Sequence, residues 1–265
     1  MNSHTDEWID CRAYEHYAES LCSNNEEQIV GTFIYGDQNY GLDTDKSMVC
    51  SKLLVIPYDL ENKDMISSST HITMNNDWVT SLDIRMYFDL LKKQDFNSVE
   101  ILFSKYFMLN PQYENIWNTL VENNELISRL NPYLMVENLY NIGNRAYKSL
   151  QKTSEDKQYI LIKYGYNPEW LSTLMYIDEV LSKYVSGSSF EDCLQSSVAE
   201  HLIEIREGKL EDKVGFKLAE TTIEHLNSLK DDFCKHHNKK IELSEAVNII
   251  DKVEDDILAK FKENG

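Results

Sequence analysis

The stretch from Gly36 to Pro57, GDQNYGLDTDKSMVCSKLLVIP, decides how the chain folds. It follows a run rich in β-branched and aromatic residues, QIVGTFIYG, which begins at Gln28 and ends at Gly36. It closes with a short apolar run, SKLLVIP, which begins at Ser51 and stops at Pro57. Both runs have the composition of β-strands, and glycine and proline commonly mark strand ends. The sequence therefore predicts two strands joined by a glycine turn and a polar loop.

The flanking segments predict a mixed chain. A helix is expected from Asp6 to about Ser23, whereas residues 61–76 are polar and irregular. From Asp77 to Lys93, apolar residues recur at helical spacing, which predicts a second helix. The segment SVEILFS, from Ser98 to Ser104, alternates briefly between polar and apolar residues and predicts a third strand.

The rest of the chain has helical character. Asn110 suits a helix N-cap and Pro111 suits the first helical position, where a missing N–H costs nothing. Further helices are expected at about 125–151, 168–185, 189–207, 210–234 and 244–262, with breaks at Gly165, Gly187 and Gly208. The predicted class is α+β, with a small mixed β-sheet core and helices in residues 1–107 and an all-helical region in residues 108–265.

Composition limits the class of protein. The chain has 265 residues, 42% of them hydrophobic, and only 9 Gly and 4 Pro, as expected of a folded and mostly helical protein. No apolar run approaches 20 residues and the N-terminus is acidic, so we expect no membrane span, no signal peptide and a cytoplasmic location. The cysteines are scattered without a CxxC pair and are expected to be reduced thiols: Cys11, Cys22, Cys50, Cys193 and Cys234.

The net charge of −19 excludes a basic nucleic-acid-binding footprint and disfavours anionic lipid. Two interpretations remain open. The charge can serve solubility alone. It can also form an acidic surface for a basic partner, such as a nucleic-acid-binding protein.

The central stretch also has a family resemblance. Its ordered residues are Gly36, Asn39, Tyr40, Gly41, Leu42, Asp43, Thr44, Ser47 and Lys52. The likeness continues through DIRMYFDLLKKQDFNSVEILFS, GYNPEWLSTLMYIDEVL and IREGKLEDKV. In these segments the chain resembles the predicted nucleotidyltransferases of the DNA polymerase β superfamily, of the minimal bacterial and phage kind. The resemblance implies a cleft in which two carboxylates on one strand and a third on a neighbouring strand hold Mg²⁺ against an NTP.

The chain departs from that scheme at the positions that the resemblance assigns to chemistry. The serine after Gly36 is replaced by Asp37, whose carboxylate would repel a phosphate. The two strand carboxylates are replaced by Met48 and Cys50, whose sulfur atoms do not suit Mg²⁺. The third carboxylate, Glu100, is retained. The resemblance therefore implies a vestigial catalytic site.

The resemblance also implies a former nucleotide cleft. Asn39, Tyr40 and Lys52 would belong to it from the central stretch. Related sequences carry lysine, histidine and arginine on a later helix, where this chain has Glu169, Thr173 and Tyr176. Groups that could face an anion are thus acidic or neutral here. These six residues are candidate binding residues.

Other chemistry at these residues stays open. Asp37, Asp43, Asp45 and Glu100, with Asp59 after the strand, could substitute for the lost carboxylates, or the loop aspartates could only form turns. Cys50 could be a nucleophile activated by His71, or a buried thiol. The CKHH segment of Cys234, His236 and His237 could suggest zinc, although its spacing fits no strong zinc pattern.

Three hypotheses for function follow. The first is a catalytically inactive nucleotidyltransferase-fold protein, without cofactor, that binds a basic protein or a nucleic-acid-binding complex. A specific form of it is a phage-encoded inhibitor of a host defence complex in the bacterial cytoplasm. The second is an active transferase that moves NMP from an NTP to RNA or protein with Mg²⁺ or Mn²⁺. The third is a regulatory subunit that binds a nucleotide without metal, which the charge of Asp37 disfavours.

Overall fold

The computed structural model describes residues 5–23, 27–44, 47–60, 68–152, 158–237 and 245–264. The chain forms two compact units, one made of Met1–Asn131 with Ile241–Gly265 and the other of Pro132–Lys240. Helices predominate beside one mixed sheet, which confirms the predicted α+β class and its helical C-terminal region. None of the helices in the described ranges is both long enough and apolar enough to cross a membrane.

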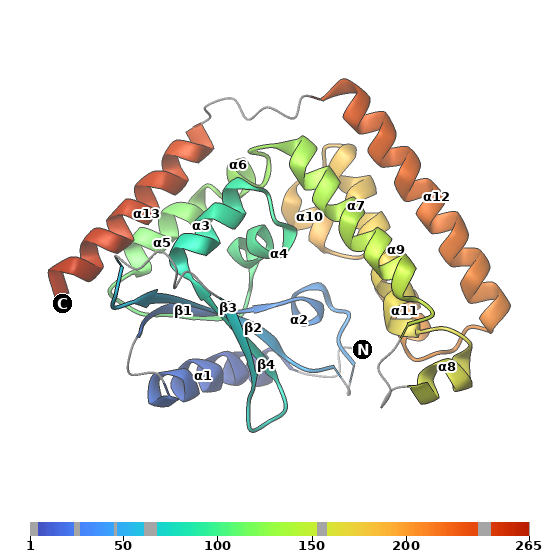
Figure 1. Ribbon diagram of the computed structural model, residues 1–265, viewed down its shortest axis with the longest axis horizontal. Coiled ribbons are helices and arrows are strands. Elements are labelled where there is room, and N and C mark those ends of the chain that lie inside the picture. The colour runs from blue at the N-terminus through green and yellow to red at the C-terminus, as the bar shows by residue number, and fades with distance from the viewer. Residues whose placement is uncertain are drawn as a thin grey trace. The chain divides into compact units, whose positions relative to one another are not determined.

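The first unit contains a five-stranded sheet in the order β3-β4-β2-β1-β5 (Figure 1). The strands are β1 (Glu27–Tyr35), β2 (Cys50–Pro57), β3 (Ser68–Ile72), β4 (Trp78–Asp83) and β5 (Phe107–Leu109). Strands β2 and β4 are parallel, and the other neighbouring pairs are antiparallel. Strand β2, which contains the apolar run, is the central strand. Its backbone therefore pairs with β1 on one side and with β4 on the other.

The two faces of the sheet pack against different elements. Helix α1 (Asp6–Ser23) covers the face on which Leu53, Val55 and Val79 form an apolar cluster with Tyr17. On the opposite face, Phe33 packs against Trp117, with ring centroids 4.6 Å apart. That face is covered by α3 (Ile84–Lys92), α4 (Phe96–Val99), the 3-10 helix η2 (Glu100–Phe103), α5 (Glu114–Glu122), α6 (Asn124–Ser128) and α13 (Glu245–Asn264), with the four-residue α2 (Asp37–Tyr40) beside β1. Alternate side chains along each strand therefore face different packing partners.

The second unit is helical and is centred on α9 (Pro168–Val185), which contacts four neighbouring helices. Its helices are α7 (Pro132–Ser149), α8 (Gln158–Tyr164), α9, α10 (Phe190–Leu194), α11 (Ala199–Arg206) and α12 (Asp212–His236). Gly143 of α7 allows close packing, because an added Cβ would lie 2.5 Å from a methyl carbon of Leu226 on α12.

Several predicted elements are confirmed. The first helix, the first two strands and the helix at 168–185 are present within one residue of their predicted ends. Gly165, Gly187 and Gly208 each have a positive φ, which explains the breaks at these glycines. The expected helix at 125–151 is instead the pair α6 and α7, and the one at 189–207 is the pair α10 and α11. The five cysteines are free thiols, as expected.

The prediction of one helix from Asp77 to Lys93 is wrong in its first half. Residues Trp78–Asp83 form β4, and the helix begins only at Ile84. The spacing of Val79 and Leu82 matches a helix, but Val79 packs in the cluster under α1 and β4 pairs with β2. Asp83 then caps α3 by accepting a hydrogen bond from the Arg85 N–H.

The polar segment before it also differs from prediction. Within residues 61–76, Ser68–Ile72 forms the edge strand β3, and residues 61–67 lie outside the described part of the chain. All five β3 residues are exposed, so no alternation of apolar and polar residues marks the strand. Pairing with β4 determines its conformation.

The predicted strand from Ser98 to Ser104 is wrong as well. This segment belongs to α4 and η2, and the third strand of this region is β5, a few residues later. Successive residues Ser98–Leu102 are all buried, which a half-exposed strand does not allow. The next helix begins at Glu114 and not at Pro111, because Asn110 caps a turn by accepting from the Gln112 N–H.

Candidate functional site

The glycine turn ends β1 and is braced by side chains of α2. Gly36 has φ +84°, a conformation that other residues rarely adopt. The Asn39 amide donates to the Ile34 carbonyl at 2.8 Å, and the Gln38 amide donates to the Met48 carbonyl at 3.0 Å. The turn is therefore held to both β1 and the segment that enters β2.

Five of the candidate residues lie near one another on the sheet face opposite α1. Cys50 is paired with Tyr35 of β1, and Lys52 follows on the same face of β2. The Gly36 N–H donates to Glu100 Oε1 at 2.5 Å, and the Tyr40 hydroxyl lowers the pKa of the same carboxyl. We refer to Gly36, Tyr40, Cys50, Lys52 and Glu100 as the Glu100 cluster.

Burial dominates the electrostatics of Glu100. It raises the pKa of the carboxyl from its ordinary 4.5 to about 7, against the opposing effects of the Tyr40 hydroxyl, the Gly36 N–H and the charge of Lys52. The charge of Asp37 raises the pKa further. Glu100 is thus a buried carboxyl that gains and loses its proton near neutral pH.

Lys52 is also buried, and burial lowers the pKa of its amine, against the opposing charges of Asp95 and Glu100. Its Nζ donates to the Asn97 carbonyl at 2.5 Å and lies 5.5 Å from the centre of the Tyr35 ring. The amine is therefore directed into α4 and away from solvent.

Cys50 is held as a thiol. Burial raises its pKa to about 11, and the charges of Asp37, Asp77 and Glu100 add to the effect. His71, the base considered for a nucleophile, pairs with Val79 of β4, whose side chain packs under α1. His71 and Cys50 therefore lie on opposite faces of the sheet.

Among the other candidate carboxylates, Asp37 acts on this cluster through its charge. Asp43 is buried in the loop after α2, and Asp59 follows the far end of β2 from Cys50. Asp45 lies outside the described residues. Within the described ranges, no three His, Cys, Asp or Glu side chains are grouped in a way that could hold a metal, and this includes Cys234, His236 and His237.

The three candidate residues of α9 belong to the second unit. Tyr176 is buried, and its hydroxyl donates to the Leu194 carbonyl of α10 at 3.0 Å. The Thr173 hydroxyl donates to the Glu169 carbonyl one turn earlier, at 2.9 Å. Tyr176 thus links two helices, whereas Glu169 is exposed at the start of α9.

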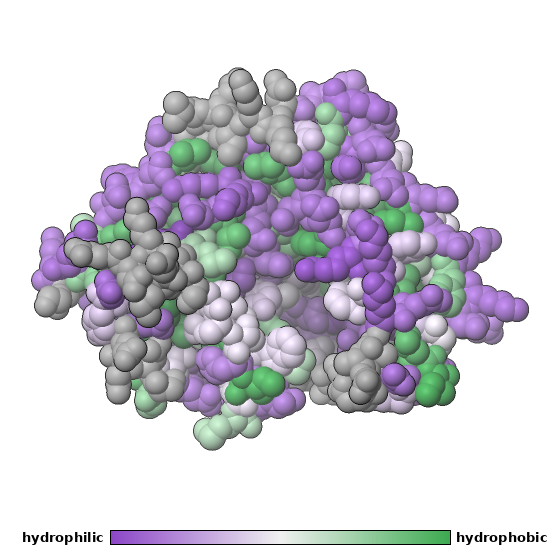
Figure 2. All heavy atoms as spheres, viewed as in Figure 1, coloured by the Kyte–Doolittle hydropathy of each residue, from purple (hydrophilic) through white to green (hydrophobic). Residues whose placement is uncertain are grey.

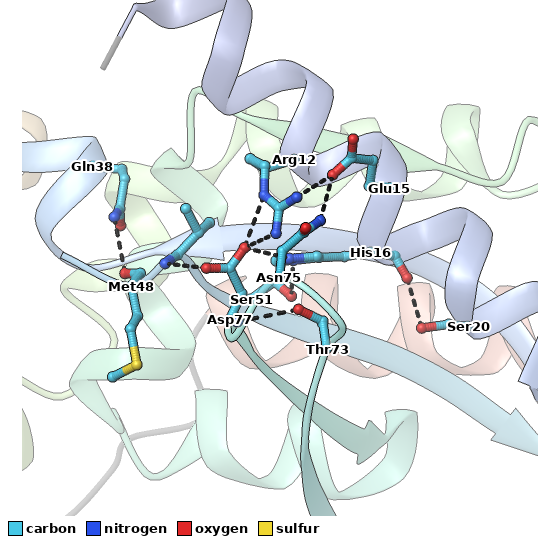
Figure 3. Close-up of polar contacts among 11 residues, drawn as sticks. Arg12, Glu15, His16, Ser20, Gln38, Met48, Ser51, Thr73, Asn75 and Asp77 are labelled. Carbon is cyan, nitrogen blue, oxygen red and sulfur yellow. Dashed lines mark hydrogen bonds and ion pairs between the residues drawn. The ribbon is translucent and has the colours of Figure 1, made fainter. Parts of the chain in front are cut away.

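A buried network on the α1 side of the sheet was missed by the sequence analysis (Figure 3). Asp77 accepts from Arg12 Nε at 2.8 Å and lies 3.2 Å from His16 Nε2, while His16 Nδ1 lies 2.9 Å from Ser51 Oγ. The second carboxylate oxygen of Asp77 accepts from the Val49 N–H at 3.0 Å. A residue pair four apart on α1, Arg12 and His16, is the only local signal in the sequence.

This network contains serine, histidine and aspartate, the residue types of a catalytic triad, but its role is to stabilise the fold. Ser51 has no solvent exposure and His16 has 1%, so the hydroxyl cannot meet a substrate. Burial raises the pKa of Asp77, but the hydrogen bonds from His16, Arg12 and Val49, with the charge of Arg12, outweigh burial and lower it. The ionised Asp77 therefore joins α1 to the start of β2 and to the β3–β4 turn.

No protein-family model matches the chain, and no curated protein matches it at a significant level. The residues of the site form a closed cluster around Glu100, with Asp37 beside it.

Proposed function

We propose that the protein is a nucleotidyltransferase-fold protein that has lost its metal-dependent chemistry and acts by binding a protein partner. The observation that carries the proposal is the hydrogen bond from the Gly36 N–H to the Glu100 carboxylate. A glycine turn of this kind binds anions through its backbone N–H groups. Here the protein's own carboxyl group accepts from that N–H.

The state of Glu100 supports this proposal. A carboxylate that binds Mg²⁺ must be ionised and must direct its oxygens at the ion. Glu100 is buried, has a pKa raised to about 7, and accepts a hydrogen bond from the Gly36 N–H. Its retention in the sequence is therefore explained by support of the turn.

The residues around Glu100 give independent support. Met48 and Cys50 carry sulfur, which is a poor ligand for Mg²⁺. Asp37 adds negative charge beside the turn and would repel a triphosphate. These three departures, at Asp37, Met48 and Cys50, all act against metal and phosphate binding.

The charge of the chain supports a basic partner. A net charge of −19 favours encounter with a positively charged surface and disfavours direct binding of nucleic acid. A basic protein, such as a component of a nucleic-acid-binding complex, fits this field. An inhibitor encoded by a phage and directed at such a complex of its host is the specific form that we propose, acting in the bacterial cytoplasm without a cofactor.

A second candidate function is an active transferase that uses Mg²⁺ or Mn²⁺ and an NTP. The observation that favours it is that the carboxylates of Asp37 and Glu100 lie near each other. The charge of Asp37 acts on Glu100 and also on Cys50. In that case Asp37 and Glu100 would bind the metal together. The NMP group of the NTP would then pass to RNA or protein, with pyrophosphate as the leaving group.

A thermal-shift titration with each NTP, with and without Mg²⁺ or Mn²⁺, separates these functions, because a ligand of the folded state raises the melting temperature. The natural protein is expected to show no metal-dependent shift. The variant Met48→Asp/Cys50→Asp/Asp37→Ser, which restores the ligand types, is expected to show one. A metal-dependent shift of the natural protein would support the transferase, and a metal-independent shift would support a nucleotide-binding regulatory subunit.

A further inference from the structure

A group of large apolar side chains is exposed at one end of the sheet edge. Ile72, Met74 and Trp78 have relative exposures of 60%, 91% and 43%, and Met48 has 38%. We refer to these four residues as the β3-edge patch. Figure 2 shows hydrophobic atoms at the lower margin of the view, where the β3–β4 hairpin projects in Figure 1.

The strand register places Ile72 and Trp78 together. Ile72 of β3 is paired with Trp78 of β4, which is in turn paired with Cys50 of β2. Paired residues share a face of the sheet, and this face is the one opposite α1. Figure 3 shows the Met48 side chain pointing away from Arg12 and His16 of α1. The patch is therefore continuous with the row that leads to the Glu100 cluster.

The backbone beside the patch is an open template for pairing. Strand β3 is the edge of the sheet formed by the described residues, and its sequence, SSTHI, contains neither lysine nor proline. Natural edge strands are commonly protected by charges, proline or bulges, because their outward N–H and C=O groups pair readily with another chain. This edge combines free pairing capacity with an apolar anchor point, which is the basis of strand addition.

Negative charge lies near this end of the sheet. Asp37 acts on Cys50, the neighbour of Trp78 in the paired row, whereas the charge of Asp77 is balanced by Arg12. The whole chain carries −19, so a second copy would be repelled and would bring no compensating charge to this edge. A basic segment would be attracted.

We infer that the β3 edge binds an extended basic segment of a partner protein, which adds a strand beside Ser68–Ile72 and places apolar side chains on the β3-edge patch. Backbone hydrogen bonds supply affinity in this mode, and alternate side chains supply specificity. The inference rests on the proposed function in assuming that the protein acts by binding, and it specifies where and what it binds.

The test begins with selection from a random nine-residue peptide library displayed on yeast, with the natural protein as bait. The enriched peptides are expected to be basic and to alternate apolar with polar residues. A synthetic copy of the most enriched peptide is then titrated into isotope-labelled protein. Changes of amide NMR signals are expected in Ser68–Ile72 and at Trp78, with contacts between peptide and β3 backbone of the kind seen between paired strands.

Two variants make the test specific. Ile72→Lys/Met74→Lys adds positive charge and removes two anchors, and is expected to weaken peptide binding about tenfold or more. Ile162→Lys is the matched control, because Ile162 on α8 is 85% exposed and lies in the second unit. The control is expected to bind as the natural protein does. Because all three substituted side chains are exposed, each variant is expected to keep the natural melting temperature.

Several results would overturn the inference. They are the absence of any enriched peptide, an enriched pool that is acidic, signal changes confined to other elements, and equal binding by the two variants. Binding of RNA or of anionic vesicles at the same edge would overturn it too, as would dimerisation through β3 measured by sedimentation. The NTP and metal titration is independent of these results, so failure of this surface and failure of the proposed function can be told apart.

Discussion

The Glu100 carboxylate and the Gly36 backbone N–H are joined by a hydrogen bond of 2.5 Å, although 64 residues separate them in the chain. The bond connects η2 with the turn that ends β1. It makes the protonation state of Glu100 a determinant of how firmly the turn is held, and it gives a direct route to test the site.

Glu100 is predicted to give the protein a measurable pH dependence. Burial raises its pKa from 4.5 to about 7, so the folded state binds the proton more tightly than the unfolded state. The free energy of unfolding therefore falls as pH rises from about 4.5 to about 7, and it levels off above that range. Glu100→Gln keeps an acceptor for the Gly36 N–H and removes the titration.

The difference in unfolding free energy between Glu100→Gln and the natural protein should change by about 1–3 kcal/mol in favour of the variant between pH 4.5 and 8. Urea denaturation at several pH values measures it. Glu122→Gln, at an exposed position of α5, is the control and should track the natural protein. Parallel curves for all three proteins would contradict the prediction.

The buried network around Asp77 is predicted to carry a large part of the stability of the first unit. Asp77→Asn leaves the Arg12 guanidinium, which is 6% exposed, without its main anionic partner. Removal of one member of a buried ion pair costs about 3 kcal/mol or more. Urea denaturation of the variant measures this loss.

Asp251→Asn provides the comparison, because Asp251 pairs with Lys92 at 2.6 Å and its side chain is 53% exposed. An exposed pair contributes at most about 1 kcal/mol. Similar losses of unfolding free energy for the two variants would show that the network around Asp77 stabilises the protein no more than an exposed ion pair does.

Two of the five strands of the sheet could be predicted from local sequence. β1 and β2 combine β-branched and aromatic residues with a glycine and a proline at their ends, and these signals are local. β4 could not be predicted in this way, because the spacing of Val79 and Leu82 also fits a helix and only the pairing with β2 makes it a strand. β3 has no apolar pattern at all.

The proximity of some candidate site residues could also be predicted. Gly36, Cys50 and Glu100 do lie near one another, as the family resemblance implied, whereas their chemical role stays a proposal. The partners of Asp77 could not be predicted, because His16 and Arg12 lie 61 and 65 residues away in the chain. These contacts form because the pairing of the strands places the β3–β4 turn beside α1, which no local sequence signal predicts.

Cys50 is predicted to react slowly with iodoacetamide. Its pKa of about 11 lies two units above the ordinary value of 9, so the reactive thiolate is about one hundredfold less abundant at pH 8. Cys22, which is exposed, is the internal reference. Mass spectrometry after timed labelling measures both rates, and Asp37→Asn should speed labelling of Cys50. Equal rates at the two cysteines would refute the idea of a protected thiol.

Tyr176 is predicted to stabilise the second unit and not to serve as a ligand contact. Its hydroxyl donates to the Leu194 carbonyl inside the unit, so Tyr176→Phe leaves a buried acceptor unsatisfied. The expected cost is about 1–2 kcal/mol in chemical denaturation. Tyr159→Phe, at a position 63% exposed, should be neutral. An unchanged unfolding free energy for Tyr176→Phe would show that this hydroxyl does not stabilise the second unit.

The most direct test of the central claim is nucleotide transfer itself. Each α-³²P-labelled NTP is incubated with the protein, Mg²⁺ or Mn²⁺, and pooled RNA and protein acceptors, beside the Glu100→Gln variant. We expect no label above background with either protein, because Glu100 is bound to Gly36 and sulfur-containing side chains stand where the family resemblance implies the other two carboxylates. Metal-dependent labelling by the natural protein that Glu100→Gln abolishes would contradict the account and identify an active transferase.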